Sequence, residues 1–261
     1  MSRAMRHTRH VAPCLAMLLA GLTHAAEPAP IRSAFGPGEQ STFEVSYLGV
    51  PTGIATITVG LKMQQYGRDV WPLVCTAQTD LDIYPVRDRF VSYWDFATQQ
   101  NVGSDFVADE NKKRRREKFR YDREAQKIFA TKQAGGKEER EVTYPLPDGV
   151  VDLAAAAFQV RNRPLNIGDT LTISIFTGMI TYQMKAKVEG REKRKTAMGE
   201  KDCLRVSFTA DWSGMLAPRK PLTMFFTDDA FHVPVRFEAE LVLGSVVAEL
   251  KTFYPGKDYS K

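Results

Sequence analysis

The chain has few of the residues on which most catalytic and metal sites depend. Its 261 residues include four histidines and three cysteines. His7, His10 and His24 lie within the first 26 residues, which leaves His232 as the one histidine of the remaining sequence. The sequence also has no G-x-S-x-G elbow, Walker loop, C-x-x-C pair or dinucleotide-binding fingerprint. These absences argue against multi-histidine metal sites, cofactor enzymes and most nucleophilic catalysis, so we expect no cofactor and no metal.

A hydrophobic run long enough to cross a bilayer as a helix is missing too. The longest apolar stretch, at 11–22, follows a basic start and precedes the small residues T-H-A-A. This order is typical of a secretory signal peptide, and the stretch is too short for a membrane helix. We therefore expect residues 1–26 to be cleaved on export to the periplasm. Cys14 lies near the start of the apolar stretch and not at its end, which argues against a lipid anchor.

The sequence has little excess charge once this segment is removed. The full chain carries a net charge of +5, with 36 basic and 31 acidic residues. Loss of the three arginines at 3, 6 and 9 leaves 33 basic and 31 acidic residues, a net charge of +2. A charge this small does not predict a nucleic-acid partner.

Two cysteines remain after the signal peptide, Cys75 and Cys203. An exported protein can form disulfides, and a bond between these two would close a long loop. Spacing alone does not show that the two strands are neighbours. A disulfide and two separate buried thiols therefore remain as alternatives.

Most of the remaining sequence alternates between apolar and polar residues, as a half-buried strand does. Phe43, Val45 and Tyr47 face one side, and a Gly- and Pro-containing turn leads to a second alternating stretch at 55–61. Similar stretches recur to residue 253, so we expect about ten or more strands. We predict a linker at 27–34, a single β-rich domain at 35–256 and a C-terminal tail at 257–261.

One stretch, at 147–165, carries a strong helix signal. Asp152 can cap a helix, four alanines follow, and Pro164 ends the segment. The predicted helix, at about 152–161, is apolar over most of its circumference, so it must be enclosed. The fold class we expect is mainly β: a single curved antiparallel sheet or open, incomplete β-barrel that encloses this short helix.

Three segments carry a family resemblance. They are F-G-P-G-E-Q-S-T-F-E-V-S-Y-L-G-V-P-T-G-I-A-T-I at 35–57, V-D-L-A-A-A-A-F-Q-V-R-N-R-P-L-N-I-G-D at 151–169, and F-F-T-D-D-A-F-H-V-P-V-R-F-E-A-E-L-V-L-G-S-V-V-A-E-L at 225–250. In order and spacing they resemble the signature segments of domain of unknown function 3108. Phe225 or Phe226 stands where that family usually has an aromatic residue such as Trp. The resemblance implies a β-rich periplasmic or lipoprotein-like envelope protein, and it supplies no catalytic residues.

Two surfaces are candidates for contact with partners. The most concentrated charge is a run that could meet anionic envelope components or be a solvated hairpin arm: Lys112, Lys113, Arg114, Arg115 and Arg116. Met215 and Leu216, in a predicted loop, could form an apolar contact or pack back onto the sheet edge.

Acidic residues are the remaining source of catalysis. Asp80, Asp82, Asp88 and Asp95 lie close in sequence, and Asp228 and Asp229 share a predicted turn. Paired carboxylates can hydrolyse glycans, whereas acidic residues at strand ends more commonly accept hydrogen bonds from local backbone N–H groups. We favour a non-catalytic periplasmic protein that binds a lipidic, glycan or protein component of the envelope. The alternatives are a glycan hydrolase with paired carboxylates and a structural partner in an envelope assembly.

Overall fold

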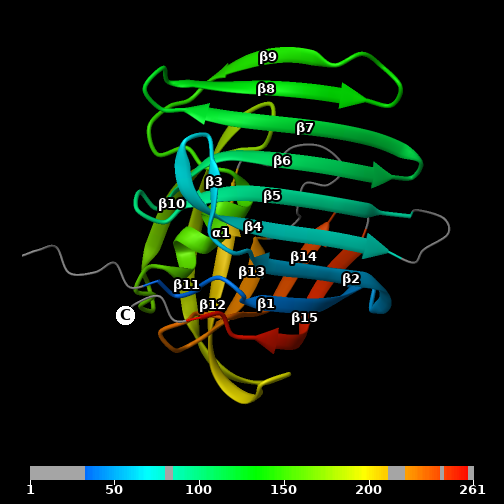
Figure 1. The fold of residues 1–261 in the computed structure, drawn as a ribbon. Helices are drawn as coiled ribbons and strands as arrows, with labels where there is room; N and C mark the ends of the chain where they lie inside the picture. Colours follow the sequence, from blue (N-terminus) through cyan, green and yellow to red (C-terminus); the bar gives the residue numbers. More distant parts are fainter. Residues whose placement is uncertain (1–32, 80–84, 211–220, 242–243, 258–261) are drawn as a thin grey trace, which may run out of the picture. The chain divides into compact units, whose positions relative to one another are not determined.

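The computed structural model describes residues 33–79, 85–210, 221–241 and 244–257 (Figure 1). Contacts divide the chain into residues 1–31 and 32–261, and every described residue belongs to the second unit. The described elements, in chain order, are β1 (Gln40–Tyr47), β2 (Val50–Val59), β3 (Met63–Gln65), β4 (Arg68–Thr79), β5 (Arg87–Asp95), β6 (Gln100–Glu110), β7 (Lys113–Asp122), β8 (Lys127–Ala134), β9 (Arg140–Pro145), α1 (Leu153–Arg161), β10 (Thr170–Phe176), β11 (Thr181–Thr196), β12 (Gly199–Thr209), β13 (Leu222–Thr227), β14 (Pro234–Leu241) and β15 (Gly244–Tyr254).

All the strands belong to one antiparallel sheet that does not close into a barrel. Its strand order is β10-β11-β12-β13-β14-β15-β1-β2-β4-β5-β6-β7-β8-β9, with β3 paired to β4 outside this path. The first strand therefore pairs with the last in the middle of the sheet, and β9 and β10 form its two edges. The predicted fold class, a curved antiparallel sheet or incomplete barrel around one helix, is confirmed.

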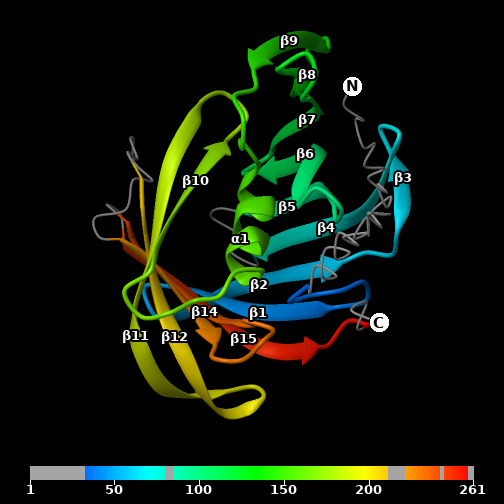
Figure 2. The ribbon, with the colours of Figure 1, turned by 90° about the vertical axis from the view of Figure 1, so that its left-hand side faces the viewer.

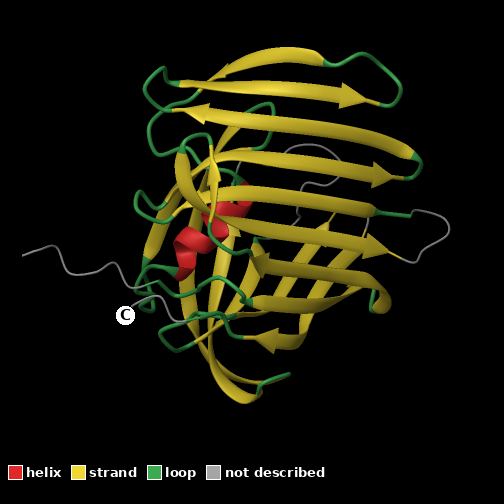
Figure 3. Ribbon diagram, in the orientation of Figure 1, coloured by secondary structure: helices red, strands yellow, loops and turns green. Residues whose placement is uncertain are grey.

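The predicted helix is confirmed almost residue for residue. Leu153–Arg161 form α1, and the Asp152 side chain accepts a hydrogen bond from the Ala155 N–H at 2.8 Å, which caps the first turn. Strands surround most of the helix (Figure 3), and its side chains Ala154, Ala155, Ala156, Phe158 and Val160 are buried. Among the described residues, no helical segment has the length and apolarity that a membrane crossing requires.

The helix α1 lies between the two halves of the sheet (Figure 2). The main hydrophobic core joins these halves through the helix. We call β1–β9 the N-terminal half and β10–β15 the C-terminal half. Phe158 of the helix belongs to the same cluster as Leu73 and Trp94 of the N-terminal half and Val206 and Phe226 of the C-terminal half. The helix therefore fills part of the space between the halves and holds them together by burial of apolar surface.

Side chains, and not a strand ladder, connect the two sheet edges. Phe176 at the end of β10 packs among Phe119, Tyr121 and Tyr144 of β7 and β9, with ring centroids 5.2–6.4 Å apart. Before α1, the backbone of Val151 forms an isolated parallel bridge with β10. Among the described strand pairs, β9 and β10 are not hydrogen-bonded to each other. The segment between β9 and α1 lies at this opening and completes the enclosure.

Two charged segments belong to strands or to the turns between them. Asn111 and Lys112 take positive φ angles of 47° and 65° and form the turn between β6 and β7. The long strand β11 continues to Thr196. Its last residues are mostly charged, so they lack the apolar alternation that identifies a half-buried strand.

Candidate functional site

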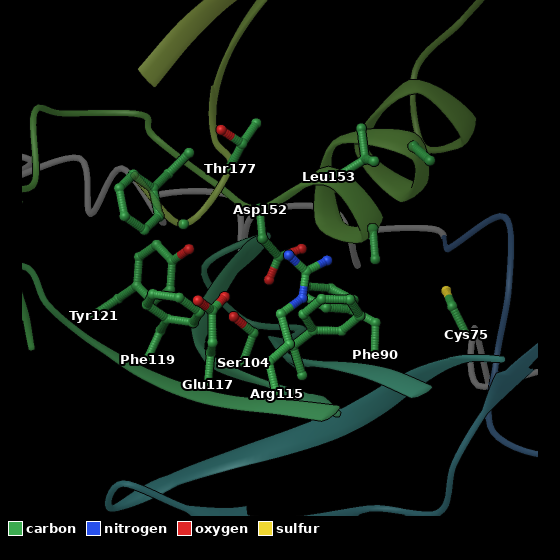
Figure 4. Close-up of a pocket in the computed structure, with 15 residues that line it drawn as sticks. Cys75, Phe90, Ser104, Arg115, Glu117, Phe119, Tyr121, Asp152, Leu153 and Thr177 are labelled. Atoms are coloured by element: carbon green, nitrogen blue, oxygen red, sulfur yellow. The ribbon is translucent and has the colours of Figure 1, made fainter. Parts of the chain in front are cut away.

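A cavity of about 450 Å³ lies between the inner face of β4–β7, the start of α1 and the end of β10 (Figure 4). Fifteen residues line it: Cys75, Phe90, Ser104, Phe106, Arg115, Glu117, Phe119, Tyr121, Asp152, Leu153, Ala154, Ala157, Phe176, Thr177 and Gly178. The helix therefore does not fill the whole hollow of the sheet.

Strand alternation and register bring the wall of this cavity together. On β7, every second residue from Arg115 to Tyr121 faces inward, so Glu117 and Phe119 share that face. The antiparallel register sets Phe119 opposite Ser104 and Glu117 opposite Phe106 on β6. One inward face across four strands thus supplies most of the wall.

The space exists because large side chains on the sheet face small ones on the helix. Phe90, Phe106 and Phe119 project from the strands, whereas α1 presents the small Ala154 and Ala157 beside Leu153 at its start. Larger helix residues at these two positions would occupy the cavity. Its aromatic and aliphatic walls are the type that binds apolar ligands.

Asp152 places a carboxyl group at the buried side of the cavity. It is 2% exposed, and its second carboxyl oxygen accepts a hydrogen bond from Asn101 Nδ2 at 2.7 Å. Burial raises the pKa of Asp152 to about 6, although the hydrogen bonds from Ala155 and Asn101 favour the ionised form. Burial likewise raises the pKa of the neighbouring Tyr121 hydroxyl, so it stays protonated.

Cys75 and Cys203 are both free thiols. Cys75 lines the cavity, whereas Cys203 belongs to a separate apolar cluster with Phe43 and Phe225. The disulfide that the sequence left open is therefore not formed, and two separate thiols are found. Burial raises the pKa of Cys75 to about 12, with a further contribution from the charge of Asp152, so its thiol is a poor nucleophile.

Charged side chains that are more exposed than Asp152 also line the cavity. The Arg115 guanidinium lies over the Phe106 ring, 4.9 Å from its centroid, and 3.6 Å from a Glu110 oxygen. Glu117 lies 3.4 Å from the ammonium nitrogen of Lys132, a buried lysine that also donates a hydrogen bond to the Gly178 carbonyl. Here long charged side chains lie beside aromatic rings. Such side chains can cover apolar surface with their stems while their charged ends remain in water.

The predicted basic run is divided by the turn and by strand alternation. Lys112 lies in the turn, and Arg114 pairs with Asp109 at 3.7 Å. All five side chains are exposed, and Arg115 is the member of the run that lines the cavity. The charge run is thus not one continuous patch.

The predicted acidic residues include several with local structural partners. Asp95 Oδ1 accepts hydrogen bonds from the backbone N–H groups of Ala97 and Thr98, and Asp229 Oδ1 accepts them from Phe231 and His232. Asp228 forms an ion pair with Arg191, while Asp88 lies beside Glu110 and has its pKa raised to about 6 by burial and by that neighbouring charge. Among the described residues, no group of three or more His, Cys, Asp or Glu is arranged to hold a metal. Asp80, Asp82, Met215 and Leu216 lie outside the described residues.

Most of the cavity could not be predicted from the sequence, although one signal was present. On β7 the inward residues Arg115, Glu117, Phe119 and Tyr121 alternate with outward Arg116, Lys118 and Arg120. That alternation indicates which face of the strand is apolar at its C-terminal end. It does not reveal the opposing helix, which follows only from the fold.

Comparisons with known proteins agree with this architecture. The family model described as "Protein of unknown function (DUF3108)" matches residues 42–251. The chain belongs to this family. None of the curated proteins matches it.

Among solved structures, a β-barrel-like protein of domain of unknown function DUF1849 from Brucella abortus is similar, with a TM-score of 0.57 and 10% identity. The match covers 86% of this chain and 100% of that one, and it shows a shared fold. Two further matches, a protein with a YmcC-like fold from Bacteroides fragilis and a protein from Parabacteroides distasonis, have TM-scores of 0.33 and 0.31. Each is 13% identical and covers 85% of this chain and 99% of the other.

Proposed function

We propose that this DUF3108 protein is an exported, non-catalytic protein of the cell envelope that binds a lipidic molecule in the cavity between α1 and β4–β7. The observation that carries the proposal is the cavity itself, with a volume of about 450 Å³ and aromatic walls. This volume lies within the range of roughly 300–1,000 Å³ that is usual for small-molecule sites. Export rests on the signal-peptide pattern at 1–26.

The nature of the walls favours a lipidic ligand over a glycan. Rings from Phe90, Phe106, Phe119 and Phe176 surround the space, so most contacts to a bound molecule would be apolar. A sugar brings many hydroxyl groups, each of which costs free energy if it is buried without a hydrogen bond. An alkyl chain has no such groups, and its burial is favourable.

The hydrolase alternative is less well supported by the two acidic residues of the cavity. Both oxygens of Asp152 accept hydrogen bonds, one from the helix start and one from Asn101. Glu117 is paired with Lys132. A glycosidase needs one carboxyl group to transfer a proton and the other to attack the sugar or activate water, so these structural roles would have to be given up.

Native mass spectrometry of the mature protein, purified from the periplasm without detergent, tests the proposal directly. We expect a bound adduct that organic solvent extracts as a lipid. The variant Ala157→Phe adds a ring at the cavity wall, and we expect it to weaken binding of a fluorescent alkyl probe by about tenfold.

Ala125→Phe provides the matched control, because Ala125 is exposed in the turn between β7 and β8 and away from the cavity lining. We expect it to bind the probe as the wild type does. A protein that carries no adduct, together with equal probe affinities for the wild type and Ala157→Phe, would rule out this cavity as a lipid site.

A further inference from the structure

A second, smaller hollow of about 240 Å³ adjoins the apolar cavity on the inner side of β7–β9. Its charged lining consists of four cations and two carboxylates: Arg115, Lys132, Lys137, Arg140, Glu117 and Glu138. Positive charge therefore exceeds negative charge at this place, although the mature chain as a whole is nearly neutral. We call it the basic cleft.

The register of three neighbouring strands produces the basic cleft. Glu117 on β7 pairs with Lys132 on β8, and Lys132 pairs with Arg140 on β9, so the three side chains share one face. The next pair on the same face sets the long Arg115 opposite the small Ala134, which leaves room above the alanine. The sheet thus positions Arg115, Lys132 and Arg140, and the segment between β8 and β9 adds Lys137 and Glu138.

The cations of the basic cleft differ in how far they are already neutralised. Lys132 is buried against Glu117 and the Gly178 carbonyl. Neither Lys137 nor Arg140 forms an ion pair with any residue in the part of the chain that the structure describes, and both are exposed. Arg115 has a looser partner in Glu110, at 3.6 Å. Three cations therefore remain able to contact an anion.

The apolar cavity and the basic cleft share two residues, Arg115 and Glu117, which line both. An aromatic-walled space and a cationic space thus meet at one pair of side chains. A molecule with an alkyl chain and a negatively charged end would match both at once. Neutral or cationic head groups would leave the excess positive charge of the cleft uncompensated.

We propose that the ligand is an anionic amphiphile whose phosphate or carboxylate head group binds Arg115, Lys137 and Arg140 while its alkyl chain occupies the apolar cavity. This proposal rests on the proposed lipid-binding function and adds the chemical class of the ligand. Arginine suits the role because its planar guanidinium donates paired hydrogen bonds to phosphate and carboxylate oxygens.

The test compares dodecyl phosphate, dodecyl maltoside and dodecyltrimethylammonium, three probes with the same alkyl chain, at concentrations below micelle formation. Isothermal titration calorimetry on the mature wild-type protein measures each affinity. We expect dodecyl phosphate to bind about tenfold or more tightly than the other two, and the difference to shrink at high salt. Inorganic phosphate is titrated separately and as a competitor.

The variant K137Q/R140Q removes one lysine and one arginine that line the basic cleft but not the apolar cavity, and we expect it to lose the preference for dodecyl phosphate while it still binds dodecyl maltoside. R116Q/K118Q removes the same two residue types from the outward face of β7 and should keep the preference. Circular dichroism confirms that both variants are folded.

Each other outcome has a definite meaning. Equal affinity for all three probes, unchanged in K137Q/R140Q, overturns the head-group proposal and leaves the lipid-binding function intact. If inorganic phosphate binds as tightly as dodecyl phosphate and displaces it, the cleft is a free-anion site and the amphiphile proposal is wrong. If no dodecyl probe binds, both the head-group proposal and the proposed function fail.

Discussion

Asp152 combines two roles that oppose each other. Its carboxyl group caps α1, which stabilises the helix, and it does so at a buried position, where a negative charge is costly. The hydrogen bond from Asn101 offsets part of this cost. Because burial still raises the pKa of the carboxyl group to about 6, the folded protein holds the proton more strongly than the unfolded chain does.

This pKa predicts how the stability of the wild type depends on pH. The unfolded-state pKa of an aspartate is about 3.9, so the contribution of Asp152 to the free energy of unfolding is largest at low pH. This contribution decreases as the pH rises from about 4 through about 6. A difference of about two units between the folded and unfolded pKa corresponds to a decrease of up to roughly 3 kcal/mol. Tyr121 and Cys75, the neighbouring titratable groups, remain neutral throughout this range.

Asp152→Asn keeps a capping oxygen and removes the titrating group. Urea denaturation at several pH values should therefore show less decline between pH 4 and 7 for this variant than for the wild type. Asp152→Ala loses the cap as well and should be less stable than Asp152→Asn by about 1 kcal/mol. If the wild type and Asp152→Asn decline in parallel, the raised pKa is not the source of the pH dependence.

At the scale of elements, close approach limits which residues β6 can carry. A Cβ atom at Gly103 would lie 2.5 Å from the Phe119 carbonyl oxygen on β7 and 2.5 Å from the ring of Tyr66, beside β3. The ring can move, but the backbone oxygen is fixed by the sheet. Gly103 therefore permits β7 and the β3–β4 hairpin to approach β6 closely.

We predict that Gly103→Ala lowers the free energy of unfolding by about 1–3 kcal/mol, because the added methyl group overlaps backbone. Gly136→Ala is the matched control, since a Cβ atom there meets nothing within 4 Å, and its effect should be within about 0.5 kcal/mol. Urea denaturation measures both. Full rescue of Gly103→Ala by Tyr66→Ala would contradict the assignment of the clash to the β7 backbone.

The helix could be predicted from the sequence because its end signals are local. The cavity could not be predicted in this way. Asp152 and Pro164 mark the ends of a helix through chemistry that acts within a few residues, so the helix was predicted closely. The cavity depends on Phe90, Phe119 and Ala157, which are far apart in sequence. Their meeting depends on the register of β4–β7 and on how the sheet curves around α1, and neither is encoded in a local pattern.

The charged stretches show the same limit. Arg115 and Arg116 are indistinguishable in a run of basic residues, yet the first faces the cavity and the second faces outward. The turn at Asn111 and Lys112, where both residues take positive φ angles, determines which of the two arginines faces the cavity. Glycine is the residue that usually indicates such a turn, and neither position has it.

At the scale of the whole described unit, one apolar cluster contacts both halves of the sheet. Phe158 lies in this cluster, with its ring centroid 4.4 Å from that of Phe35. Strands β4 and β5 contribute to the cluster from one side and β10–β13 from the other. The two halves should therefore unfold together, because neither has a complete core without the helix.

We predict that Phe158→Ala lowers the free energy of unfolding by about 3–5 kcal/mol through the cavity that it creates. Hydrogen exchange measured by mass spectrometry should show faster exchange in β4–β5 and in β11–β12 to the same extent. Leu153→Ala, on the same helix but at a side chain that is 57% exposed, should leave exchange in both halves nearly unchanged. Faster exchange in one half alone would show that the halves are independent.

The central pairing of β1 with β15 also determines the order in which the protein can assemble. Roughly 200 residues separate the end of β1 from the start of β15, so this contact is among the least local that the chain makes. During synthesis β1 is made early, and one of its edges stays unpaired until β15 is available. An unpaired strand edge can pair with another chain and so promotes aggregation. We therefore expect a chain that lacks β15 to aggregate more readily than the complete chain, because β1 then keeps one unpaired edge.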